Sequence, residues 1–159
     1  MGRALIRIAR AFGILWTVPN TVLGLVAGIV GIAFGAHAHL SRRECAIVFH
    51  RWPWGPGGAI TLGNTILHTG DSLDAPCVTY AHRAGHAKEP AIVLADHERA
   101  HVFQYMVLGP LFLPLYLAFG GVSVRNRFER AADRYALTGT GWWPWSRDEV
   151  RNSSNMGNV

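Results

Sequence analysis

The chain has 159 residues, which is enough for one domain of ordinary size. Half of the residues are hydrophobic and 16% are charged, which excludes an intrinsically disordered chain and argues against an ordinary water-soluble domain. The net charge is +5, but the basic residues flank long uncharged runs and form no basic patch. We therefore expect them to meet the anionic headgroups of a lipid bilayer, and we expect no nucleic-acid partner.

The first feature along the chain is an uncharged, strongly apolar segment in residues 11–41, preceded by three arginines. Because about 20 apolar residues cross a bilayer, residues 1–41 predict an N-terminal membrane anchor with one transmembrane helix. The alternative is a cleaved signal peptide, but the apolar run is longer than the usual hydrophobic region of such a peptide. Pro19 predicts a break in the helix.

Two GxxxG patterns lie in this segment, Gly24 with Gly28 and Gly31 with Gly35. They predict a flat helix face for close packing, although small residues are also common in membrane helices without that role.

The middle of the chain alternates short β-rich runs with turn residues. Residues 45–50, 59–67 and 77–81 predict three short strands of a small sheet, because they are rich in Val, Ile, Thr and aromatics and are separated by Gly, Pro and Asp. Residues 91–108 and 123–137 predict two helices. The fold class that we expect is an α+β membrane protein, with a compact domain in residues 42–150 and a disordered tail in residues 151–159.

The first predicted helix contains an HExxH motif, His97-Glu98-Arg99-Ala100-His101. Residues four apart share one helix face, so both imidazoles can bind one metal ion. The carboxylate of Glu98 then lies beside the ion and can take a proton from a metal-bound water.

The second predicted helix offers a third ligand. Zinc in catalytic sites has three protein ligands and one water, and two His with one Glu form an established set. Glu129 can complete that set. Asp133 lies one turn further along the same face, where it can accept a hydrogen bond from the free ring nitrogen of a ligating histidine.

These two motifs, HERAH at 97–101 and ERAAD at 129–133, resemble those of the gluzincin zinc metallopeptidases. The resemblance is closest to the membrane-embedded CAAX prenyl proteases and heat-shock membrane proteases, and to the metallopeptidase domain of beta-lactam sensors. It implies Zn²⁺ as cofactor, a zincin-like helix pair, and a location in a bacterial-type inner membrane, with the membrane face of the site left open. In such families an edge strand ahead of the HExxH helix binds the substrate backbone, and residues Gly63, Asn64 and Thr65 match that position.

The group that would stabilise an oxyanion is not marked by the sequence. Tyr105, Tyr135 and His68 are the candidates. Whether Cys45 and Cys77 form a disulfide is left open.

The position of the motifs constrains the apolar run in residues 102–124, which is long enough to cross a bilayer. A straight helix over this run would place Glu129 about 30 Å from His101, and the two could not share an ion. Helix breakers at Gly109-Pro110, Pro114 and Gly120-Gly121 therefore predict a membrane-dipping hairpin that returns Glu129 to the histidines.

Two functions are compatible with this pattern. The first is a membrane-anchored zinc metallopeptidase that hydrolyses a peptide bond of a polypeptide substrate by means of a metal-activated water. The alternative is a non-catalytic membrane scaffold or interaction protein, bound to a membrane protein partner, that retains a metallopeptidase-like fold with or without bound zinc.

Overall fold

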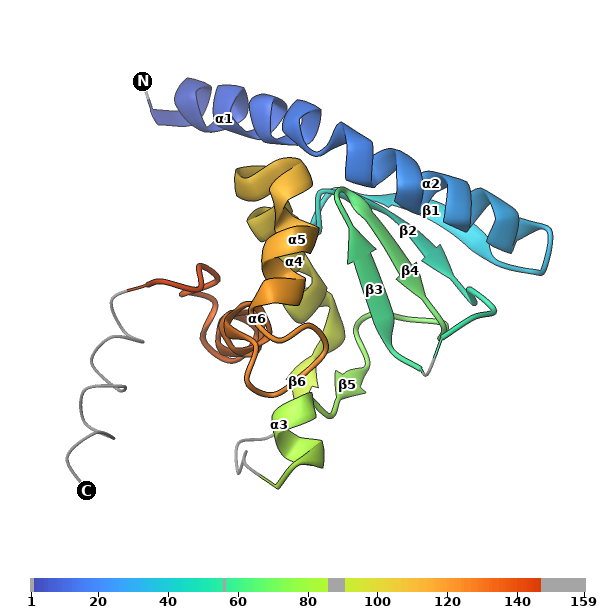
Figure 1. The fold of residues 1–159 in the computed structure, drawn as a ribbon. Coiled ribbons are helices and arrows are strands. Elements are labelled where there is room, and N and C mark those ends of the chain that lie inside the picture. Colours follow the sequence, from blue (N-terminus) through green and yellow to red (C-terminus); the bar gives the residue numbers. More distant parts are fainter. Residues whose placement is uncertain (1, 56, 86–90, 147–159) are drawn as a thin grey trace.

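The structure is a computed structural model that describes residues 2–55, 57–85 and 91–146. It is an α+β fold built around a four-stranded sheet, with helices on both faces (Figure 1). The strand order is β1-β2-β4-β3, in which β2 and β4 are parallel and the other neighbours are antiparallel. The strands are β1 His37–Ser41, β2 Ala46–His50, β3 Ala59–Leu62 and β4 Thr65–His68.

Alternate residues of the central strands face opposite helices. Val48 and Ile66 are fully buried in a core cluster with residues of α4 (Leu94–Leu108), whereas Phe49 and Thr65 lie against α2 (Val18–Ile32). The period of two along a strand thus separates the sheet into an α4 face and an α2 face. The hydrophobic core of the domain lies on the α4 face.

The glycine stripe of α2 packs on the sheet of its own chain. A Cβ atom at Gly24 would come within 2.7 Å of the Thr65 side chain, and one at Gly28 would overlap the Phe49 ring. The close packing that the GxxxG patterns predict is therefore used inside the domain, with Gly24 and Gly28 facing strands and not a second helix.

The segment predicted as a single anchor contains more structure than expected. Helix α1 (Gly2–Trp16) precedes α2, and the two helices are bent by 64° at Thr17. Residues 37–41 form β1, the strand that pairs with β2. The sequence did not reveal this strand, because residues 11–41 contain no charged residue and were therefore assigned as one anchor segment.

The predicted reversal of the chain after the HExxH helix is present. Helix α4 ends at Gly109, which has φ 55° and ψ −132°, and a 3₁₀ turn (Gly109–Leu111) leads into α5 (Phe112–Ala118). Tyr116 then lies beside His101, with ring centroids 6.3 Å apart, whereas a straight helix would separate these residues by about 22 Å. Helix α5 thus folds back along α4 (Figure 1).

Helix α6 (Arg127–Thr138) has well-defined ends. The Asn126 side chain accepts a hydrogen bond from the Phe128 amide at 2.9 Å, which caps the first turn, and Gly139 ends the helix in a left-handed conformation. Ala132 and Tyr135 of α6 pack against Ala100 of α4. This packing sets the HExxH helix and the ERAAD helix side by side.

Several boundaries differ from the predicted ones. The predicted strand at 59–67 is a hairpin, and the segment 77–81 contributes only Cys77 to the two-stranded sheet of β5 (Pro76–Cys77) and β6 (Ile92–Val93) before α3 (Tyr80–Arg83). Pairing in β6 delays the start of the HExxH helix to Leu94, and the loop before Asn126 delays α6. The sheet has four strands where three were predicted. The predicted tail, 151–159, lies outside the described residues.

One continuous helical run, Leu94–Ala118, is long and apolar enough to cross a membrane, and α1 and α2 meet the same criterion together as a bent pair. Core helices of soluble proteins can also meet it, and 39% of the apolar window in Leu94–Ala118 is buried inside the fold. Because Gly109 reverses the chain, this run is not a straight rod.

Candidate metal centre

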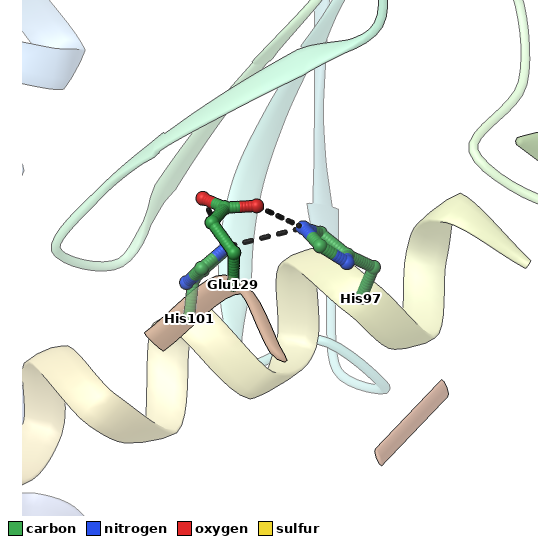
Figure 2. Close-up of side chains that lie close together, drawn as sticks. All are labelled: His97, His101 and Glu129. Atoms are coloured by element: carbon green, nitrogen blue, oxygen red, sulfur yellow. Dashed lines mark hydrogen bonds and ion pairs between the residues drawn. The ribbon is translucent and has the colours of Figure 1, made fainter. Parts of the chain in front are cut away.

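Three potential metal ligands converge between α4 and α6 (Figure 2). The Nε2 atoms of His97 and His101 are 3.1 Å apart, and the two carboxylate oxygens of Glu129 each lie 3.4 Å from one of them. One ligand atom from each residue lies within 4.8 Å of the others, and all three side chains are buried. This group could hold a metal ion.

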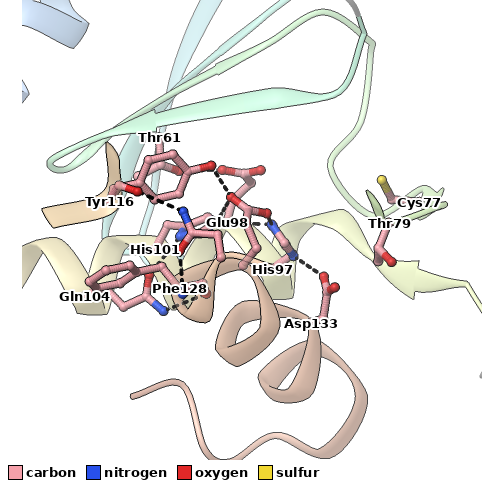
Figure 3. Close-up of polar contacts among 12 residues, drawn as sticks. Thr61, Cys77, Thr79, His97, Glu98, His101, Gln104, Tyr116, Phe128 and Asp133 are labelled. Carbon is pink, nitrogen blue, oxygen red and sulfur yellow. Dashed lines mark hydrogen bonds and ion pairs between the residues drawn. The ribbon is translucent and has the colours of Figure 1, made fainter. Parts of the chain in front are cut away.

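Figure 3 shows that a second polar side chain holds each histidine. Nδ1 of His97 lies 2.9 Å from the Asp133 carboxylate, and Nδ1 of His101 lies 2.8 Å from Oε1 of Gln104. The Gln104 amide nitrogen donates to the carbonyl oxygens of Phe128 and Trp142, which fixes the amide so that its oxygen faces His101. With a proton on each Nδ1, facing these oxygens, both Nε2 lone pairs would point into the site.

This arrangement fits a divalent cation. Two lone pairs 3.1 Å apart next to a buried carboxylate repel one another unless a cation or an additional proton lies between them. Burial would raise the pKa of Glu129, but His101 and His97 outweigh burial and hold the pKa well below its usual value. Two imidazole nitrogens and a carboxylate oxygen are ligands that suit zinc and other divalent transition metals.

Glu98 lies next to the convergent ligands and points toward the sheet. Its Oε2 accepts a hydrogen bond from Thr61 Oγ1 at 2.6 Å, and the Glu98 side chain is buried. Thr61 belongs to β3, the edge strand of the sheet. The carboxylate that the HExxH motif places beside the ligand group is thus hydrogen bonded to a residue of the neighbouring strand.

A cavity of about 410 Å³ opens beside these residues. Its walls include β3, the three ligands, Glu98 and Tyr116, and most of the remaining lining is apolar. The hydroxyl of Tyr116 donates to Oε1 of Glu129 at 2.5 Å. The ligand group is therefore open on one side to a space that can admit a small molecule or an extended peptide.

The other candidates from the sequence are dispersed. Tyr105 lines the cavity and is fully buried, but Tyr135 packs against Phe103 and Trp142. His68 hydrogen bonds to His50 and is not part of the cavity wall.

The predicted substrate strand is displaced by a few residues. Gly63 and Asn64 form the turn between β3 and β4, where Asn64 bonds to Thr17 and Thr21 of the N-terminal helices, and Thr65 is in the interior strand β4. The edge strand that faces the cavity is β3, Ala59–Leu62.

Comparison of the chain with protein-family models, with curated proteins and with solved structures finds no match. The description of this centre rests on the residues of the chain itself.

Three polar residues of the site were not identified from the sequence. Gln104 follows His101 by three positions, so its helical spacing was a usable signal. No local pattern marked Thr61 and Tyr116. The pairing of strands brings Thr61 to Glu98, and the reversal at Gly109 brings Tyr116 to Glu129.

Proposed function

We propose that this chain is a membrane-associated zinc metallopeptidase of gluzincin type. The observation that supports the proposal is the buried group of His97, His101 and Glu129 beside a cavity, with Glu98 adjacent to it. A bound zinc ion would polarise a scissile carbonyl and lower the pKa of a coordinated water.

Side chains around the ligand group would supply proton transfer, positioning of the imidazoles and oxyanion stabilisation. Glu98 would take up the proton of the attacking water on its Oε1, because Oε2 is engaged by Thr61. Asp133 and Gln104 would keep the two imidazoles in the tautomer that presents Nε2. Tyr116 could donate its hydroxyl proton to a developing oxyanion after leaving Glu129, which makes it a stronger candidate for that role than Tyr135.

The substrate class follows from the cavity wall. Strand β3 has an open edge along the cavity, and an extended polypeptide can add to such an edge by backbone hydrogen bonds. The apolar lining favours a hydrophobic segment, so we propose a membrane or juxtamembrane polypeptide as substrate.

The proposed membrane association rests on the N-terminal helices. Exposed apolar side chains cover much of α1 and the outer face of α2: Leu5, Ile8, Phe12, Leu15, Leu23, Val26 and Ile29. An apolar surface of this kind is suited to the acyl region of a bilayer.

The function is tested by two measurements on detergent-purified protein. Compared with the wild type, Glu129→Ala should lose about one equivalent of zinc by mass spectrometry, and Glu98→Gln should keep its zinc but lose at least about 100-fold in the cleavage rate of an unfolded reporter polypeptide. Glu44→Gln is the matched control, because Glu44 is an equally buried carboxylate that pairs with Ser41 and Arg43.

A wild-type cleavage rate in a zinc-loaded Glu98→Gln protein would contradict the peptidase proposal. Zinc binding with no cleavage in any form would favour the scaffold function, in which the ion stabilises the fold.

A further inference from the structure

Four histidines outside the proposed active site lie together on the sheet. His37 of β1 pairs with His50 of β2, and His39 lies two residues along the same strand face. Phe49 of β2 pairs with Leu67 of the parallel strand β4. The residues that follow them, His50 and His68, are therefore also neighbours. Three adjacent strands therefore place imidazoles on one face, the face that also packs against α4.

The two inner histidines are buried and face each other. Their Nδ1 atoms are 3.0 Å apart, and both side chains are at most 6% exposed. Two nitrogens that bind one tetrahedral ion at about 2.0–2.1 Å are separated by about 3.3 Å. The separation in this pair thus resembles that of His97 and His101, whose Nε2 atoms are 3.1 Å apart.

A third ligand is available on the exposed strand β1. The ring of His39 stacks on that of His50 with centroids 5.0 Å apart and an interplanar angle of 4°, and His37 lies slightly further away at 5.4 Å. The exposed His39 ring can turn about its side-chain torsions, because neighbouring groups do not enclose it. In the present arrangement the site offers two convergent nitrogens and an exposed third imidazole stacked beside them.

We propose that His50, His68 and His39 form a second metal site, for a divalent transition ion that prefers imidazole ligands, such as Cu²⁺, Ni²⁺ or Zn²⁺. The site is independent of the proposed active site, since none of its histidines lines the cavity.

The test uses the full chain in detergent, with His97→Ala and His101→Ala in the background to remove the first site. Cu²⁺ is the probe, because its electron paramagnetic resonance spectrum reports the number of bound nitrogens. We expect about one equivalent of Cu²⁺ with three nitrogen ligands. In this background, the double substitution His50→Gln and His68→Gln should abolish Cu²⁺ binding. The single substitution His39→Gln in the same background should weaken the affinity by more than about tenfold and leave two nitrogen ligands.

His82→Gln and His37→Gln are the controls and should keep the wild-type affinity. The proposal is overturned if the folded background protein binds no Cu²⁺, or if binding survives the loss of His50 and His68. If His37→Gln loses Cu²⁺ binding and His39→Gln keeps it, the assignment of His39 as the third ligand is overturned. Because His39 is exposed, we expect the His39→Gln variant to fold even if the variants at the buried His50 and His68 do not. Circular dichroism checks the folding of every variant.

Discussion

At the scale of single residues, the candidate centre is defined as much by the partners of the ligands as by the ligands. Gln104 is fully buried and uses all of its amide hydrogen-bonding groups, one toward His101 and two toward backbone carbonyls beyond α4. The Asp133 carboxylate of α6 lies 2.9 Å from Nδ1 of His97. Such partners raise the basicity of a ligating imidazole and fix its orientation.

Replacing Asp133 should therefore weaken metal binding without removing a ligand. For Asp133→Asn we expect a loss of about 10- to 100-fold in zinc affinity, because the uncharged amide no longer stabilises the proton on Nδ1 of His97. Competition with a chromophoric chelator measures the affinity. Asp96→Asn is the control, since Asp96 pairs with Arg43 and Arg99 on the other side of α4, and an equal loss in both variants would refute the positioning role.

The paired histidines of the sheet predict a dependence of stability on pH in chelator-treated protein. Burial, and then the charge that His50 would carry, lower the pKa of His68 from 6.5 to about 4, and burial also lowers the pKa of His50. The unfolded chain takes up protons on both rings near pH 6.5, whereas in the folded chain His68 stays neutral until about pH 4 and His50 also resists protonation. The free energy of unfolding therefore falls as the pH falls from about 6.5 toward 4.

Denaturant unfolding at pH 7 and pH 5 measures this effect against a variant with His50→Leu and His68→Leu. The wild type should lose about 1–3 kcal/mol more than the variant over that interval. An equal loss in both proteins would show that other groups carry the pH dependence.

At the scale of elements, the decisive feature is the reversal between α4 and α5. Gly109 adopts a backbone conformation that L side chains rarely adopt, and a Cβ atom there would overlap the indole of Trp16. The carbonyl oxygen of Gly109 also accepts a hydrogen bond from Asn20 at 2.9 Å. The N-terminal helices thus hold the turn that returns Glu129 to the histidines.

We expect Gly109→Ala to reduce both stability and zinc binding, because the side chain opposes the turn and displaces Trp16. The loss of stability should exceed about 2 kcal/mol, and zinc content should fall with it. Gly139→Ala provides the comparison, since Gly139 also has a positive φ but no neighbour near its Cβ position, so this variant should lose about 1–2 kcal/mol and keep its zinc. Thermal unfolding with metal analysis separates the two variants.

The elements show which features a sequence can reveal. HExxH spacing predicted that His97 and His101 converge, and the breakers at Gly109 and Pro114 predicted the reversal, because both depend on local geometry. The strand at 37–41 was missed, because it follows the apolar run directly and no charged residue separates the two. The pairing of β2 with β4 and the contact of Thr61 with Glu98 depend on strands that meet only in the folded chain, so no local pattern marked them.

At the scale of the whole molecule, the N-terminal helices combine two surfaces. The inner face of α2 packs its glycines on the sheet, and the outer faces of α1 and α2 expose large apolar side chains. Arg7 and Arg10 add positive charge to α1. A bent pair with these properties is suited to lie in or cross a bilayer while it remains attached to the domain.

Replacing the exposed residues Leu5, Ile8, Phe12 and Leu15 with serine should weaken membrane association and leave the domain folded. Removing this apolar area reduces the transfer free energy into lipid by several kcal/mol, at about 25 cal/mol per Å². Flotation with vesicles that contain anionic lipid measures the effect. Replacement of Leu40 and Leu137 with serine is the control, because both are also exposed but lie outside the N-terminal helices and outside Leu94–Ala118.

The junction of α4 and α6 has a consequence for the way the molecule resists unfolding. An ion held by His101 and Glu129 would close a loop of residues 102–128, and like any cross-link it would restrict the conformations open to the unfolded chain. The ligands come from two segments that also meet through small side chains, aromatic rings and the hydrogen bond from Gln104 to the carbonyl oxygen of Phe128. A bound ion would therefore stabilise the folded chain against unfolding. The free metal concentration would then set the stability of the chain as well as its chemistry.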